Sequence, residues 1–312
     1  MKIEKLKTEV KSSPIFNMSL SSKELFHSNF IAWLIETYPI KMWQIFADYT
    51  TLINQKDDFV IRTETVEREK DNIDLMFNVS NKKDETIVHK IIIENKVKSL
   101  PYISQLQEYS EKMSKTPNLH FVLLSLSEPI HLYEDFENKI IKAGQNIWEY
   151  LSYEKLIEGL KVQFFQLRKE DENDKVQYHK SIVRDYTNLI RFLIEINDLT
   201  NFDENENFNY NLKADQLREI RIHDFYLKKK YENIAYELYK KLRKRKNEIK
   251  VSLEIRSFGD KINWESTIRE IYISSGMTNS AGLIDVKYTI CKGLSLGIQI
   301  QENNYRLVIE DE

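Results

Sequence analysis

Two strand-like segments in the first third of the sequence carry charged residues beside apolar runs. Segment 72–79 (NIDLMFNV) holds Asp74, and segment 86–97 (TIVHKIIIENKV) ends close to Glu94 and Lys96. Side chains alternate between the two faces of a strand, so Glu94 and Lys96 point to the same face. An isolated E-x-K pattern is just as typical of a strand that ends in solvent. Its meaning therefore depends on what the neighbouring strand places beside it.

Pairing the two segments as a hairpin decides whether the two acids meet. If Asn81 pairs with Ile87 across the loop 82–86, the antiparallel register places Asp74 opposite Glu94 and matches the apolar faces. A slip of one residue would spoil both matches. We therefore expect this register, with the two carboxylates about 5 Å apart on adjacent strands.

Carboxylates in that arrangement repel each other unless a cation lies between them. Mg²⁺ suits such a pair, because it takes one or two carboxylates and retains several waters. Lys96 can hold an attacking water or neutralise charge on a phosphate. A helix opened by Pro101 would place Gln105 and Tyr109 on one face, four residues apart, where they can flank the same site.

The elements that must position these residues form an alternating α/β pattern. Apolar spacing predicts a first helix with Ser21 or Ser22 as its N-cap, and the fourth strand follows a helical crossover and can run parallel to its neighbour. The expected helices are 19–38, 41–54, 101–115, 148–166 and 175–197, and the expected strands are 59–69, 72–79, 86–97 and 119–127. This order predicts an α/β core with helices on both faces of the sheet.

A second region follows a polar, Asn/Asp/Glu-rich segment at 197–215. We expect one long helix over 214–247 and then a small, largely antiparallel β-rich region, which gives domains at 1–200 and 212–312. Basic residues at 228–230 and 240–246 form either a DNA-contacting stripe or a solvated helix face. The β-rich region can recognise the substrate, pair subunits or bind another protein, and the sequence does not choose among these.

Composition restricts the class of protein. The 46 basic and 49 acidic residues nearly cancel, so any nucleic-acid-binding face must be local. The single cysteine, Cys291, excludes an internal disulfide framework and fits a reducing compartment. The charged N-terminus is not a secretory signal, and no apolar run reaches the ~18 residues of a membrane span. We expect a cytoplasmic protein with no membrane association.

These motifs, in this order, resemble the PD-(D/E)XK nuclease superfamily over about residues 20–127. The Gln-x-x-x-Tyr pattern looks like the motif of its RecB-like branch, and the segment ELFHSNFIAWLI (24–35) is similar to an uncharacterised bacterial subgroup. One departure is Ile73, which stands where the proline of the superfamily's name would precede the aspartate. The matching residues are Glu24, Asp74, Glu94, Lys96, Gln105 and Tyr109.

The resemblance implies a restriction-endonuclease-like αβββαβ core and hydrolysis of DNA phosphodiester bonds with Mg²⁺ or Mn²⁺. It makes Asp74 and Glu94 metal ligands, with Glu24 as an auxiliary ligand, and Lys96 the group that places the water. Gln105 and Tyr109 would order the site or contact DNA. It also implies a role in restriction or phage defence.

Four questions stay open at this point. Glu24 is equally well explained as a favourable charge in the first turn of its helix, and Glu67 and Glu69 are either extra ligands or part of a solvated strand face. For the whole protein, the alternative to an enzyme is a non-catalytic member of the same fold that binds nucleic acid or protein. A homo-oligomer or a partner protein bound through the C-terminal region is also compatible with the sequence.

Overall fold

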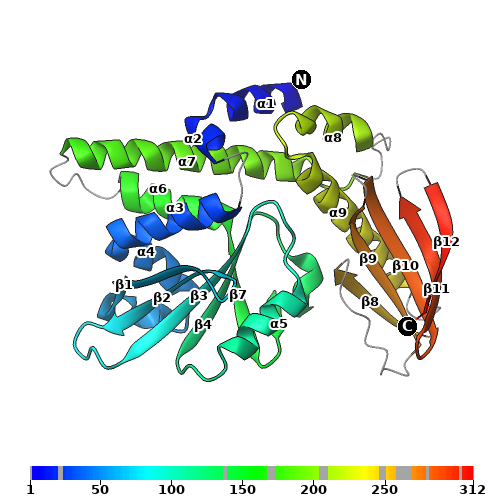
Figure 1. Cartoon of the computed structure of the whole chain (residues 1–312), viewed down its shortest axis with the longest axis horizontal. Helices are drawn as coiled ribbons and strands as arrows, with labels where there is room; N and C mark the ends of the chain where they lie inside the picture. Colours follow the sequence, from blue (N-terminus) through cyan, green and yellow to red (C-terminus); the bar gives the residue numbers. More distant parts are fainter. Residues whose placement is uncertain are drawn as a thin grey trace. The chain divides into compact units, whose positions relative to one another are not determined.

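The computed structural model describes residues 2–19, 24–135, 139–166, 173–203, 210–245, 251–257, 269–278, 281–301 and 304–311. The chain forms two compact units (Figure 1). Unit 1 comprises Met1–Pro101, Gln105–Pro129 and Tyr133–Glu195, and unit 2 comprises Tyr102–Ser104, Ile130–Leu132 and Ile196–Glu312. The expected caps Ser21 and Ser22 lie outside the described residues.

Unit 1 is built on a mixed sheet of seven strands in the order β1-β2-β3-β4-β7-β6-β5. The strands are β1 (Phe59–Lys70), β2 (Ile73–Asn81), β3 (Val88–Lys96), β4 (Leu119–Ser125), β5 (Tyr133–Asp135), β6 (Ile140–Ala143) and β7 (Asn146–Ser152). The first three pair antiparallel, whereas β3, β4 and β7 run parallel to one another. Parallel central strands are covered on both faces, which explains why the isoleucine run of β3 is wholly buried.

Helices α3 (Glu24–Thr37), α4 (Pro39–Phe46) and α6 (Tyr153–Lys161) pack against strands of this sheet, and α5 (Ile103–Lys112) lies beside it (Figure 1). The chain also forms α1 (Lys2–Ser12), α2 (Pro14–Met18) and α7 (Asp174–Asp198), with short turns η1 (Ala47–Tyr49), η2 (Ile53–Asp58) and η4 (Val162–Gln166). The turn η3 (Ile130–Leu132) belongs to unit 2. Helix α3 is mostly buried because its apolar residues are spread around much of its circumference. The mixed α/β fold with a restriction-endonuclease-like core is confirmed.

The predicted β2–β3 register is confirmed. Leu75 pairs with Ile93 and Phe77 with Ile91, and the Asn81 amide donates to the Ile87 carbonyl at 3.1 Å. The matched apolar faces selected this register, since a slip would expose the residues that the core now buries.

The prediction of a helix over 148–166 is wrong in its first part. Residues Asn146–Ser152 form β7, in which Trp148 and Leu151 are buried while Ile147 and Glu149 are exposed. The helix starts only at Tyr153, because the Ser152 side chain caps it by accepting a bond from the Lys155 amide at 3.1 Å. The predicted helix 41–54 likewise ends at Phe46 and continues as 3₁₀ turns.

Unit 2 contains α8 (Tyr210–Arg218), α9 (His223–Lys244) and a five-stranded sheet in the order β12-β11-β10-β9-β8. Its strands are β8 (Ser252–Ser257), β9 (Glu270–Thr278), β10 (Ala281–Cys291), β11 (Leu294–Gln301) and β12 (Asn304–Asp311). All neighbours pair antiparallel except β8 and β9, which are parallel. The prediction of one helix over 214–247 is wrong, because the chain breaks between α8 and α9, where Arg221 adopts φ 54°.

Helix α9 packs closely on this sheet. A Cβ atom at Gly282 would lie 2.2 Å from the Tyr231 ring, so only glycine permits the approach. Lys229 and Lys230 are buried, which removes them from the solvent-facing basic stripe that the sequence suggested. The exposed basic residues of α9 are confined to its C-terminal turn.

An ionic cluster lies inside unit 2. The Lys229 ammonium contacts Glu232 Oε2 at 2.5 Å, and His131 of η3 contacts the other oxygen of the same carboxylate. Burial alone would raise the pKa of Glu232, but Lys229 and His131 outweigh it and lower this pKa to about 2. Glu232 is therefore ionised inside the unit and holds η3 to α9.

Candidate active site

Glu94 and Lys96 form a buried ion pair at the end of β3. Lys96 Nζ lies 2.6 Å from Glu94 Oε1, and the side chains are 10% and 2% exposed. Glu94 Oε2 is buried and accepts no hydrogen bond from the part of the chain that the structure describes. A buried carboxylate oxygen without a donor is costly, so this atom is suited to meet a ligand.

The electrostatics of this pair follow from burial and from the neighbouring carboxylate. Burial raises the pKa of Glu94 to about 8, and the charge of Asp74 adds to the rise while Lys96 opposes it. For Lys96, burial would lower the pKa, but the carboxylates of Glu94, Glu24 and Asp74 outweigh it and raise it. The site thus carries excess negative potential that a cation would relieve.

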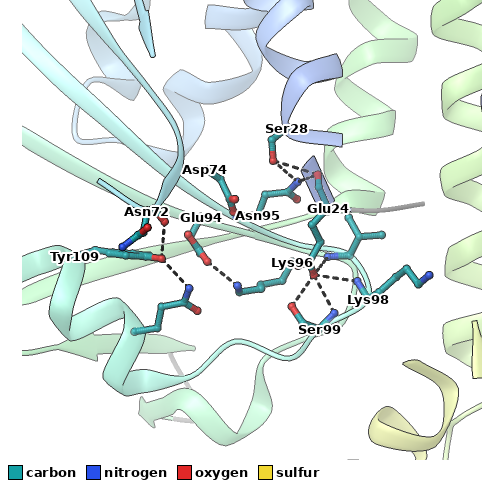
Figure 2. A network of polar contacts seen from close by, with 12 residues as sticks. Glu24, Ser28, Asn72, Asp74, Glu94, Asn95, Lys96, Lys98, Ser99 and Tyr109 are labelled. Carbon is teal, nitrogen blue, oxygen red and sulfur yellow. Dashed lines mark hydrogen bonds and ion pairs between the residues drawn. The ribbon is translucent and has the colours of Figure 1, made fainter. Parts of the chain in front are cut away.

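Asp74 lies on β2 beside Glu94, one position beyond the Leu75–Ile93 pair (Figure 2). Its Oδ2 accepts a hydrogen bond from the Asn95 amide at 2.7 Å. Burial raises the pKa of Asp74 to about 6, although the Asn95 amide and Lys96 both act to lower it. The structure therefore brings Asp74, Glu94 and Lys96 together, with one carboxylate oriented by the backbone of β3.

Gln105 and Tyr109 bridge α5 to the strand that carries Asp74. Gln105 Nε2 donates to the Tyr109 hydroxyl at 2.8 Å. This hydroxyl donates to the Asn72 carbonyl at 2.7 Å (Figure 2). Burial and the nearby Glu94 charge raise the pKa of Tyr109 to about 12, so its hydroxyl remains a donor. The two side chains hold the start of β2 in place.

Glu24 supports the turn that follows Lys96. Its Oε1 accepts hydrogen bonds from the amides of Val97, Lys98 and Ser99 at 3.2, 3.3 and 3.0 Å, and from the Ser99 hydroxyl at 2.6 Å. These four bonds gather three consecutive residues of the β3–α5 connection around one carboxylate (Figure 2). Glu24 is thus tied to the site through the backbone that leaves β3.

A second polar network, which the sequence analysis did not identify, lies on the other face of β3. Asn95 is 1% exposed; its Nδ2 donates to Ser28 Oγ at 3.0 Å, and its Oδ1 accepts from the Tyr153 hydroxyl at 2.6 Å. The signal was present in the sequence, because Asn95 is a polar residue on the apolar face of a central strand. His27 belongs to the core: it contacts Tyr186 at 3.1 Å, and burial lowers its pKa to about 3.

Comparison with known families identifies the superfamily of the chain. A family model described as PD-(D/E)XK nuclease superfamily matches residues 14–270. The chain belongs to this superfamily. No curated protein and no solved structure matches the chain significantly.

PD-(D/E)XK nucleases generally use divalent metals, and the residues present can be tested for fit. Among the described residues no cluster of three His, Cys, Asp or Glu side chains has the arrangement of a metal site. Asp74 and Glu94 are two carboxylates at one strand end, and Mg²⁺ takes one or two carboxylates while keeping its waters. The unbonded buried oxygen of Glu94 fits the same interpretation.

Proposed function

We propose that this PD-(D/E)XK protein is a metal-dependent nuclease that hydrolyses phosphodiester bonds of DNA. The observation that carries the proposal is the convergence of Asp74, Glu94 and the Glu94-bound ammonium of Lys96 at one buried strand end. The Gln105–Tyr109 bridge supports assignment to the RecB-like branch.

The proposed chemistry is the attack of a water oxygen on phosphorus with loss of one ester oxygen. Held by Asp74 and Glu94, a Mg²⁺ or Mn²⁺ ion would polarise a phosphate oxygen and lower the pKa of a bound water. The Asn95 amide fixes the orientation of Asp74, and the ion pair fixes that of Glu94. Lys96 has ammonium protons beyond the one directed at Glu94, and these donate to the water or to the charge that develops on the phosphate. The departing ester oxygen takes up a proton, and the water loses one.

The flanking residues have positioning roles in this proposal. Gln105 and Tyr109 hold β2, and Glu24 holds the turn that follows Lys96. Glu24 also remains a proposed auxiliary ligand, because the hydrogen bonds to the turn all use its Oε1.

Cleavage assays with a matched control pair test the proposal. Single- and double-stranded DNA are incubated with the protein and Mg²⁺, Mn²⁺ or EDTA, and the Glu94→Ala and Lys96→Ala variants are compared. We expect metal-dependent cleavage that falls about a hundredfold or more in either variant. Glu158→Ala and Lys155→Ala remove the same residue types from an exposed ion pair of 2.8 Å and should leave cleavage unchanged.

The result that overturns the enzyme proposal is the absence of cleavage with both metals. DNA binding without cleavage would then favour the non-catalytic alternative. The charged pair buried at a strand end speaks against that alternative, since a binding module gains nothing from a buried carboxylate oxygen that lacks a donor.

We also propose a role in restriction or phage defence in the cytoplasm. This rests on the similarity of segment 24–35 to a bacterial subgroup and on the single cysteine. Cells producing the protein should resist phage, and cells producing the Lys96→Ala variant should not. If phage plate equally well on cells producing either protein, the defence role is wrong, and the proposed chemistry is not affected. No helix in the described part of the chain is long and apolar enough to cross a membrane.

A further inference from the structure

One face of the unit 2 sheet is apolar across its last three strands. The register places nine side chains of β10, β11 and β12 on this face, which we call the β10–β12 face. They form three cross-strand rows: Ile284, Ile300 and Tyr305; Val286, Ile298 and Leu307; and Tyr288, Leu296 and Ile309. None of the nine is charged. The opposite face is polar, and there Lys287 lies 2.9 Å from Glu310 and 3.3 Å from Asp285.

Helix α9 covers only part of this apolar face. Tyr231 packs on Gly282 of β10, and Ile284 next to it is 3% exposed. Exposure then increases strand by strand toward the sheet edge. On β11, Leu296 and Ile298 are 43% and 46% exposed.

The edge strand β12 is the most exposed part of the face. Tyr305, Leu307 and Ile309 are 74%, 79% and 74% exposed. The uncovered apolar area is on the order of 600 Å², which is at the upper end of what a monomeric protein exposes in one patch. An edge strand with this composition is a surface that proteins normally cover.

We propose that the β10–β12 face packs against the same face of a second copy of the chain, forming a two-fold symmetric dimer of two sheets. Two such faces would bury about 1,200 Å² in total, which is the lower limit for a standard stable interface. An uncharged apolar surface is complementary to itself, as a two-fold interface requires. The net charge of −3 adds little repulsion between two copies.

Face-to-face packing is the arrangement that buries these residues. Sheets pack about 10 Å apart with their inner side chains interdigitated. Pairing of two β12 edges alone would satisfy backbone groups but leave the apolar side chains exposed. The proposal is independent of nuclease activity, because it rests only on unit 2.

We place the two-fold axis of this dimer near Leu307. This residue lies in the middle row of the face and is the most exposed of its nine side chains, at 79%, so the proposed dimer brings its two copies together. A charge at this position would therefore meet an identical charge in the dimer.

Light scattering coupled to gel filtration tests the dimer. The wild-type chain of 37.3 kDa should run at twice this mass at micromolar concentrations. Leu307→Asp and Leu307→Lys should each be monomeric, with a dissociation constant raised at least about a hundredfold, because each dimer carries the change twice. An equimolar mixture of the two variants should recover the dimer.

Controls separate this face from general effects of charge. Ile40→Asp changes an exposed apolar residue of unit 1, which is 66% exposed, and should leave the dimer intact. Circular dichroism should show both Leu307 variants folded, and Tyr305→Asp provides a second disruption of the same face. A monomeric wild type, or a dimer that persists in Leu307→Asp and Tyr305→Asp, overturns the proposal. A mixture that stays monomeric overturns the axis at Leu307.

Discussion

Replacing Glu24 with alanine distinguishes two roles of this residue, namely holding the turn 97–99 by hydrogen bonds and binding a metal ion. In the structure one oxygen of this carboxylate accepts four hydrogen bonds from residues 97–99, at 2.6 to 3.3 Å. A hydrogen bond to a charged group contributes about 1.5–3 kcal/mol, but water can replace part of these in a half-buried turn. We therefore expect Glu24→Ala to lower the free energy of unfolding by about 2–4 kcal/mol.

No such loss is expected if Glu24 acts only as a metal ligand. Burial and then the charge of Glu24 raise the pKa of Asp74 and Glu94, but the charge of Glu24 also raises the pKa of Lys96. In the absence of metal its removal would relieve repulsion from the two carboxylates and lose attraction to the ammonium, so the stability should change little. Urea denaturation in EDTA measures the difference. Glu24→Gln keeps an acceptor but loses the charge, and we expect it to lose about half as much stability.

Glu24 does not hold the turn 97–99 in place if Glu24→Ala is as stable as the wild type in EDTA, or more stable. Glu94→Gln is the matched control, because it removes a carboxylate from the same site that accepts no such set of amides. Its stability in EDTA should fall less than that of Glu24→Ala, since burial already disfavours the charge of Glu94 and the glutamine oxygen can still accept a bond from Lys96.

Three further predictions concern the surrounding networks. Tyr109→Phe breaks the bridge from Gln105 to β2 and should slow cleavage about tenfold while costing about 1 kcal/mol of stability, measured by kinetics and urea denaturation. Asn95→Ala leaves the Tyr153 hydroxyl without its acceptor and should lower the free energy of unfolding by about 2–4 kcal/mol, measured by thermal denaturation. Because the pKa of Glu232 is lowered from 4.5 to about 2, its charge stabilises the fold above pH 4.5 and ceases to do so as the pH falls toward 2. Glu232→Gln should therefore cost at most about 3 kcal/mol at pH 7, and the cost should shrink in acid, measured by circular dichroism.

Each of these has a contrary outcome. If Tyr109→Phe cleaves DNA as fast as the wild type, the hydroxyl bridge does not position β2. A thermally unchanged Asn95→Ala would mean that its buried network contributes no net stability. A Glu232→Gln defect that stays constant from neutral pH to acid would show that lost packing, and not lost charge, is its cause.

The central hairpin could be predicted because a single physical requirement fixed it. Apolar residues on both strands must face the core together, and only one register achieves this while bringing Asp74 beside Glu94. The parallel orientation of β4 could be predicted equally well, since a helical crossover between two strands favours a parallel pair.

Elements without such a requirement were harder to infer. Strand β7 lies in a segment predicted as a helix. Its buried residues Trp148 and Leu151 are three apart, which fits a helix as well, and pairing with β4 and β6 distinguishes the two. The break between α8 and α9 depends on Arg221, which adopts a left-handed conformation. The residue types around this position do not predict that conformation. The burial of Lys229 and Lys230 also depends on packing. Lys230 donates to the Asn201 carbonyl, which is distant in the sequence, and Lys229 pairs with Glu232, which also contacts the distant His131.

The contacts of Glu24 and Asn95 show the same limit within the site. Sequence spacing identified Glu24 as an acid near the start of a helix, but its bonds reach residues more than seventy positions away. Asn95 stood inside the E-x-K pattern as an unspecified position. Its partners Ser28 and Tyr153 come from two helices whose approach to β3 is a property of the whole fold.

The path of the chain between the two units has a consequence for how the protein can be divided. Tyr102–Ser104 and Ile130–Leu132 belong to unit 2, although the sequence on both sides of each belongs to unit 1. A cut near residue 196 would therefore not yield two complete pieces, because the C-terminal fragment would lack His131, the buried partner of Glu232. We expect the chain to unfold as one cooperative block and not as two modules. Recombination could not exchange unit 2 between proteins as a single contiguous segment.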